Sequence, residues 1–181
     1  MLMKDTEIKT AVISDFERIS QVSFQTYIET YSEFFNQEVL NNFMEEKFNS
    51  NNIKQELENK LFTYLIALYD NKIIGYAKLK HQSSPPEIKL NNTMEIERIY
   101  ILKKFQSLKI GSKLLQKCIE KALHLNCNSV WLAVWEHNHK AISFYKNFGF
   151  ELKGSINFFL GKQKLNDFLM LMDLTPLDKK I

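Results

Sequence analysis

The stretch from Met94 to Leu115 constrains the fold of this chain more than any other. Residues 94–102 form a β-branched and aromatic run bounded by polar residues, which is typical of a buried strand. The apolar residues after it recur at the spacing of a helix that faces a core: Leu114, Leu115, Ile119 and Ala122. We therefore predict a central strand followed by a helix.

Residues 103–112, KKFQSLKIGS, join this strand to this helix, and we call them the phosphate loop. A turn that leads into a helix presents free backbone N–H groups at the positive end of the helix dipole, where an anion is stabilised. The loop therefore predicts a phosphate-binding turn. A solvated turn before an ordinary core helix would have much the same sequence.

A second segment, Ser129 to Leu152, predicts another strand, helix and strand. Residues 129–134 are mostly apolar, Asn138 is a good helix N-cap, and Gly149 stands where a helix ends in a left-handed residue. The inner face of the helix is predicted to carry Ala141, Ile142, Phe144, Tyr145 and Phe148.

Together these segments resemble the GNAT family of N-acetyltransferases. The pyrophosphate loop of that family reads Gln/Arg-x-x-Gly-x-Gly/Ala, and here Gln106, Lys109 and Gly111 stand at those positions, with Lys109 in place of a glycine. The later pattern Asn-x-x-Ala-x-x-Phe-Tyr-x-x-x-Gly-Phe is matched at Asn138, Ala141, Phe144, Tyr145, Gly149 and Phe150. The resemblance implies an α/β fold with a mixed, mostly antiparallel sheet flanked by helices, and a V-shaped split between the fourth and fifth strands.

The remaining elements follow from hydrophobic periodicity and from turn residues. Ser14 to Glu17 has the pattern of a capping box at the start of a helix. Asp70 and Asn71 suit a tight hairpin turn. We predict strands at residues 7–12, 61–69, 72–79, 150–159 and 165–174, helices that begin near 16 and 37, and a short helix at 53–57. A linker or repeat does not divide the 181 residues, so we expect a single domain over residues 1–181.

The resemblance implies acetyl-CoA as cosubstrate and assigns residues to it. The pantetheine arm would pair with the backbone of Ile99, Tyr100 and Ile101 in the central strand. The pyrophosphate would meet the backbone amides of Gln106, Ser107, Leu108, Lys109, Ile110, Gly111 and Ser112, and the Lys109 ammonium could pair with the phosphates. Asn138 matches a cofactor-contacting residue of the family, and its role as a helix cap is compatible with that.

Three residues are candidates for catalysis. Tyr145 matches the family position that protonates the leaving thiolate, a role that needs an O–H within hydrogen-bond reach. Glu95 and Glu97 share one face of the central strand, and one of them would help to remove a proton from the amine; we favour Glu97, acting through a water. The alternatives are a core tyrosine for Tyr145 and an ion pair with Arg98 or a lysine for Glu97.

Composition narrows the choice of partners and compartment. The net charge of +3 is spread over mixed lysines and glutamates without a basic stripe, so we do not expect nucleic acid as a partner. The spacing of Cys118 and Cys127 fits neither a disulfide motif nor a metal site, and a metal cofactor is not expected. Lys4 and Asp5 stand where a signal peptide would be apolar, and we find no run suited to a membrane span. We predict a cytoplasmic protein.

The acceptor is predicted from a closer resemblance to bacterial PaiA-type spermidine/spermine N-acetyltransferases. It is carried by MEIERIYILKKFQSLKIG, VWLAVWE and FFLGKQKLNDFLM. A polyamine would require an acidic channel, to which Glu29, Glu33, Glu95, Glu97 and Glu136 could contribute. Two alternatives stay open: an acetyltransferase for a protein N-terminus, a lysine or another small amine, and a non-catalytic acyl-CoA-binding module. Whether the chain forms a homodimer is also open.

Overall fold

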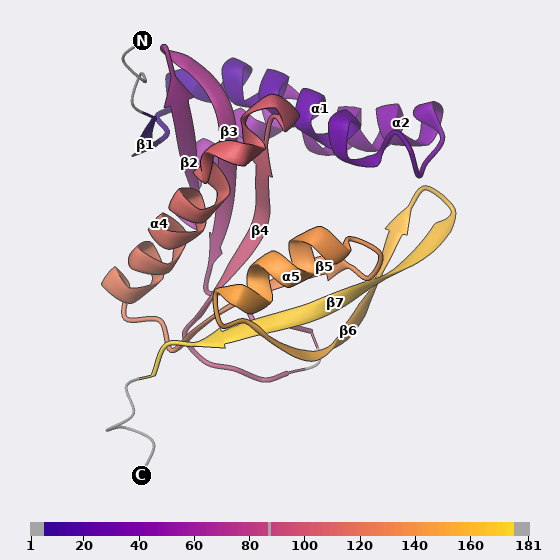
Figure 1. Ribbon diagram of the computed structural model, residues 1–181. Coiled ribbons are helices and arrows are strands. Elements are labelled where there is room, and N and C mark those ends of the chain that lie inside the picture. The colour runs from indigo at the N-terminus through magenta and orange to yellow at the C-terminus, as the bar shows by residue number, and fades with distance from the viewer. Residues whose placement is uncertain (1–5, 87, 176–181) are drawn as a thin grey trace. The chain divides into compact units, whose positions relative to one another are not determined.

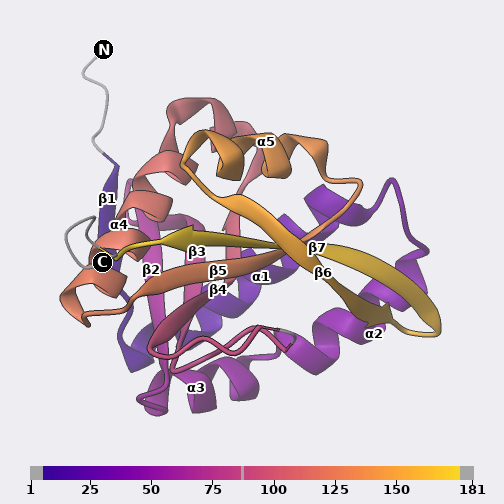
Figure 2. The same ribbon diagram turned by 90° about the horizontal axis from the view of Figure 1, so that it is seen from below.

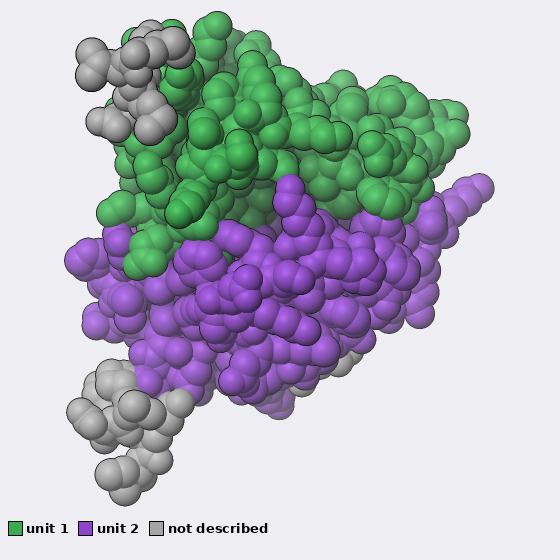
Figure 3. Space-filling view, viewed as in Figure 1, with its two compact units in different colours: residues 1–79, 98–118 green, residues 80–97, 119–181 purple. Residues whose placement is uncertain are grey.

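The computed structural model describes residues 6–86 and 88–175, and the chain divides into two compact units (Figure 3). The first unit contains the chain up to Leu79 together with Arg98–Cys118, and the second contains Lys80–Glu97 and the chain from Ile119 onward. Lys4 and Asp5 lie outside the described residues. The expectation of a single domain over residues 1–181 stays a prediction.

Among the described residues, the sheet has seven strands in the order β1-β2-β3-β4-β5-β7-β6. Their bounds are β1 (Glu7–Thr10), β2 (Phe62–Tyr69), β3 (Lys72–His81), β4 (Thr93–Ile101), β5 (Ser129–Trp135), β6 (Glu151–Leu160) and β7 (Gln163–Asp173). The pairs β1–β2, β5–β7 and β6–β7 are antiparallel, whereas β4 and β5 are parallel. The predicted α/β fold with a mixed, mostly antiparallel sheet is confirmed.

The first unit packs helices on both faces of its strands (Figures 1 and 2). These helices are α1 (Phe16–Tyr31), α2 (Gln37–Lys47), α3 (Ser50–Glu58) and the beginning of α4 (Ile110–His124). α1 and α3 cover one face of β2 and β3, and the first turns of α4 cover the other. Fully buried residues of the core come from both kinds of element: Ile19, Leu40, Phe48, Ile53, Ile66, Tyr76 and Leu114.

The start of α1 corrects one prediction. A short 3-10 turn, η1 (Ile13–Asp15), precedes the helix, so the predicted capping box of Ser14 and Glu17 is wrong. Asp15 is the N-cap residue of α1 but makes no side-chain cap bond to it. Its carboxylate accepts instead from the backbone N–H of Val12, at the start of η1, at 3.1 Å and from Arg18 Nη1 at 3.1 Å.

The second unit contains the first half of β4, the end of α4, the strands β5, β7 and β6, and α5 (His139–Asn147). α5 lies on one face of β5, β7 and β6 (Figures 1 and 2). Ile142 and Tyr145, on one side of α5, are buried. The strands predicted at residues 150–159 and 165–174 are confirmed as β6 and β7. They form an antiparallel hairpin around Gly161, which has φ 60°, with a register shift in β6 between Leu152 and Gly154. None of the helices among residues 6–86 and 88–175 has both the length and the apolar character of a membrane span.

Candidate active site

The end of β4 is held tightly against β3. A Cβ added to Gly75 of β3 would lie 2.7 Å from the backbone oxygen of Tyr100, so only glycine allows this close approach. The Leu102 N–H donates to the Ile74 oxygen at 2.9 Å. These contacts fix the half-buried residues Ile99, Tyr100 and Ile101, to which the pantetheine arm was assigned.

The parallel register between β4 and β5 is short. It joins residues 93–95 of β4 to residues 129–131 of β5. Both strands continue beyond this pairing, β4 to Ile101 and β5 to Trp135. The described pairing between these two strands therefore ends before the residues assigned to the cofactor. The assignment of Ile99 to Ile101 to pantetheine stays a prediction.

The phosphate loop is a helical turn with one left-handed residue. Residues Lys103–Leu108 form a 3-10 helix, η2, and Lys109 follows at φ 56° and ψ 21°, after which α4 begins at Ile110. The Lys109 oxygen accepts from the Lys113 N–H at 3.1 Å and so opens the new helix. Lys109 thus adopts the conformation that the glycine of the family loop would provide without strain.

This backbone geometry suits an anion. A right-handed helical residue, Leu108, followed by a left-handed one, Lys109, turns successive N–H groups toward one concave spot, known as a nest. The first N–H groups of α4, from Ile110 onward, have no acceptor within their own helix. Gln106, Ser107, Leu108 and Lys109 are exposed, whereas Ile110 is buried.

Gln106 has a role that the motif did not reveal. Its side-chain Nε2 donates to the Ile101 oxygen at 3.2 Å, so it ties η2 back to the end of β4. The Phe105 N–H donates to the Leu102 oxygen at 2.8 Å and closes the same turn. The loop is thus braced by its own residues.

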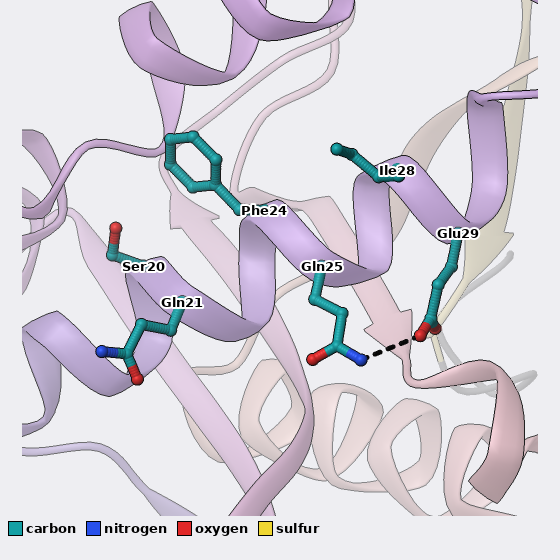
Figure 4. A pocket seen from close by; sticks show the side chains of 6 residues that line it. All are labelled: Ser20, Gln21, Phe24, Gln25, Ile28 and Glu29. Carbon is teal, nitrogen blue, oxygen red and sulfur yellow. Dashed lines mark hydrogen bonds between the residues drawn. The ribbon is translucent and has the colours of Figure 1, made fainter. Parts of the chain in front are cut away.

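An open groove runs along α1 (Figure 4). It is lined by Ser20, Gln21, Phe24, Gln25, Ile28 and Glu29. The Glu29 carboxylate is engaged at both oxygens: Oε1 accepts from Gln25 Nε2 at 3.0 Å, and Oε2 accepts from the backbone N–H of Lys103 at 2.7 Å. Glu33 is exposed. The acidic channel proposed from the sequence stays a prediction.

The second unit contains both candidate glutamates. Glu95 and Glu97 are half-buried and lie two residues apart on β4, so they share a face of the strand as predicted. Glu95 Oε2 accepts from the Ser83 hydroxyl at 2.6 Å, and the Ser83 oxygen accepts from Trp131 Nε1 at 2.7 Å. Ser83 lies in the loop between β3 and β4 and is buried, and its hydroxyl holds Glu95 in place.

Arg98, the ion-pair partner considered for Glu97, has contacts within the first unit. Its Nη1 lies 3.9 Å from Glu56 Oε2, and its guanidinium stacks 4.7 Å from the centre of the Phe48 ring. Glu56 also pairs with the buried Lys78 at 2.6 Å. These contacts tie α3 to the strands beneath it.

α5 carries the remaining predicted residues. Asn138 is its N-cap, as predicted, and its Oδ1 accepts from the Ala141 N–H at 3.2 Å. Tyr145 is buried, and its ring packs edge-on to Phe144 and Phe150 at 5.3 and 5.8 Å between ring centres. Gly149 adopts the left-handed conformation that its place after the helix predicted, with φ 93°. The roles of Asn138 and Tyr145 toward the cofactor stay predictions.

A carboxylate pair in the second unit was missed by sequence reasoning. Burial raises the pKa of Asp167 to about 6, with a further contribution from the neighbouring Glu136. Glu136 Oε2 in turn accepts from Asn166 Nδ2 at 2.9 Å. Asp167 is the aspartate of the FFLGKQKLNDFLM ending, which was the one available signal for it.

Comparisons with known proteins identify the family. The model of the acetyltransferase (GNAT) family matches residues 24–150, which is more than half of the chain. This chain belongs to the GNAT family. It is accordingly an N-acetyltransferase, as predicted from the two motifs.

Three similar proteins extend this result. An uncharacterized N-acetyltransferase from the pepI 3′ region of Lactobacillus delbrueckii subsp. lactis is 29% identical over 167 residues, covering 91% of this chain and 96% of the relative. The spermidine N(1)-acetyltransferase of Thermoplasma acidophilum is 27% identical and covers 81% of this chain and 89% of the relative. The crystal structure of the PaiA N-acetyltransferase from Thermoplasma acidophilum in complex with coenzyme A has a TM-score of 0.78 at 24% identity, covering 93% of this chain and 99% of that one. This GNAT chain therefore has the fold of that structure.

Proposed function

We propose that this protein transfers an acetyl group from acetyl-CoA to a primary amine of a polyamine such as spermidine or spermine, directly in a ternary complex. The observation that carries the proposal is the nest at Leu108 and Lys109, placed between the end of β4 and the start of α4. Nests and helix N-termini bind phosphate groups because their N–H groups converge on one anion. The diphosphate of CoA is such an anion.

In this proposal the phosphate loop binds the diphosphate, and the Lys109 ammonium adds a positive charge beside it. The backbone of Ile99 to Ile101 holds the pantetheine arm, and Asn138 completes the cofactor contacts from the start of α5. We propose one acetyltransferase domain over residues 1–181.

The amine must lose a proton before it can attack. A model alkylamine pKa of about 10.4 means that holding the amine neutral at pH 7 costs roughly 4.6 kcal/mol. We assign the base to Glu97, acting through a water, with Glu95 two residues away on the same face of β4. The nitrogen attacks the thioester carbon, the C–S bond breaks, and Tyr145 donates its proton to the departing thiolate.

Polyamines are the favoured acceptors because of the relatives. The Thermoplasma relative is a spermidine N(1)-acetyltransferase by name, and a Bacillus subtilis spermine/spermidine N(1)-acetyltransferase is 28% identical over 91 residues, half of this chain. A cationic substrate also fits the two glutamates on β4, Glu95 and Glu97. A cytoplasmic location and a homodimer stay predictions.

The experiment measures CoA release from acetyl-CoA with spermidine, spermine, putrescine, a lysine peptide and a peptide with a free N-terminus. We expect turnover of spermidine and spermine, and losses of at least about 10²-fold in kcat for Glu97→Gln and Tyr145→Phe. Turnover of peptides alone would overturn the polyamine assignment. CoA binding without turnover of any amine would overturn catalysis and support the binding-module alternative.

A further inference from the structure

We propose that Glu29 of α1 is a positioning residue that holds the first turn of the phosphate loop. This inference rests on the proposed function, because it concerns how the loop binds the CoA diphosphate.

The first N–H of η2 belongs to Lys103, and the first N–H groups of a helix have no acceptor within it. A side chain at the N-cap usually satisfies one of them. Leu102, the N-cap of η2, has no such side chain, and Glu29 supplies the acceptor from a helix 74 residues earlier in the sequence. The cap of the phosphate loop therefore comes from α1.

The Lys103 contact is short and charge-assisted. Glu29 Oε2 lies 2.7 Å from the Lys103 nitrogen, within the range of strong N–H to carboxylate bonds. The second oxygen accepts from Gln25 Nε2 one turn back on α1, so the carboxylate is held from its own helix as well (Figure 4). With both oxygens engaged, Glu29 is oriented toward the loop backbone.

η2 passes this restraint on to the nest. The helix contains only six residues, from Lys103 to Leu108, and Lys109 follows it at once. A 3-10 helix this short is stable only if its ends are held, because it has few internal hydrogen bonds. Releasing its first turn allows Leu108 and Lys109 to leave the nest conformation. Part of the free energy of CoA binding is then used to order the loop again, so the affinity for CoA falls.

This placement changes the role that the sequence suggested for Glu29. As part of an acidic channel, Glu29 would bind the acceptor amine and set its KM. As a cap of the phosphate loop, it sets the affinity for CoA. The two roles predict losses in different kinetic constants.

The experiment titrates CoA into the full-length protein by calorimetry. Glu29→Ala is expected to weaken CoA binding by about tenfold, since bonds to charged groups contribute most among hydrogen bonds. Glu29→Gln keeps an oxygen acceptor of the same length and should recover much of this loss, because a neutral bond is roughly half as strong. Glu29→Asp keeps the charge but shortens the side chain, and should behave like the alanine variant. The matched control is Glu17→Ala, which removes the same charge from an exposed position on α1.

Circular dichroism at the titration temperature shows whether each variant is folded. If Glu29→Ala is unfolded, the comparison of CoA affinity uses Glu29→Asp and Glu29→Gln in its place. An unchanged CoA affinity in folded Glu29→Ala, or a rise in the KM for spermidine alone, would overturn the inference. A wild-type protein that does not bind CoA would overturn the proposed function instead.

Discussion

Replacing Lys109 by glycine is expected to stabilise the protein. Lys109 has φ 56° and ψ 21°, a left-handed conformation that costs a residue with a side chain about 1–2 kcal/mol. Glycine adopts this conformation without strain. However, glycine loses more conformational entropy on folding than lysine does, which lowers the free energy of unfolding by about 0.5–1 kcal/mol. The difference leaves Lys109→Gly about 0.5–1 kcal/mol more stable than the wild type.

The matched control is Lys117→Gly in α4, the helix that follows Lys109. Lys117 is exposed and lies within α4, where the same chemical change meets right-handed helical backbone. There glycine should reduce the free energy of unfolding by about 1 kcal/mol. The two lysine-to-glycine substitutions are therefore expected to have opposite signs.

The assay is urea unfolding followed by circular dichroism, with the free energies obtained by linear extrapolation. A Lys109→Gly variant as unstable as Lys117→Gly would show that Lys109 is not left-handed and would refute the reasoning. Adding Lys109→Ala separates charge from backbone, because it removes the ammonium and keeps the strain. Lys109→Gly and Lys109→Ala should both bind CoA more weakly in titrations if the ammonium pairs with the diphosphate. In urea unfolding, Lys109→Ala should be the less stable of the two.

Further predictions concern the buried charges and the close strand contact. Glu56→Ala removes the carboxylate that pairs with buried Lys78 and should lower the free energy of unfolding by about 3–5 kcal/mol, measured in urea. Gly75→Ala places a Cβ against the Tyr100 oxygen, so we expect about 1–3 kcal/mol lower stability and weaker CoA binding, whereas unaltered values would contradict the contact. The pKa of Asp167 is raised from 3.8 to about 6 in the folded protein, so the native state holds the proton in that range and stability falls as pH rises through it. Asp167→Asn should remove this pH-dependent loss of stability, so in urea unfolding the variant should be more stable than the wild type at pH 8 but not at pH 4. A stability difference that is the same at both pH values would contradict the raised pKa of Asp167.

Local signals in the sequence sufficed for much of the fold. Asp70 and Asn71 adopt the positive φ angles, 52° and 58°, that a tight hairpin needs, and Asn138 caps α5 through its own side chain. Such features depend on residues close in sequence. The same holds for the strand, loop and helix that begin at Met94, which follow from hydrophobic period and turn chemistry.

Contacts between distant segments could not be predicted in this way. Lys78 stands in a strand where a lysine would be expected to reach solvent. It is buried, and its ammonium pairs with Glu56, on a helix 22 residues earlier. Glu29 and Ser83 hold the phosphate loop and Glu95 through similarly distant contacts. At Ser14, a local pattern was present but misled, because the chain makes a 3-10 turn before α1 and the Asp15 carboxylate binds the start of that turn.

The most direct test of acetyl transfer to polyamines is a mass spectrum of spermidine after incubation with the protein and acetyl-CoA. We predict a monoacetylated spermidine that forms with the wild type and is strongly reduced with Tyr145→Phe. Spermidine that stays unmodified, under conditions in which calorimetry shows CoA bound to the wild type, would contradict the proposed function.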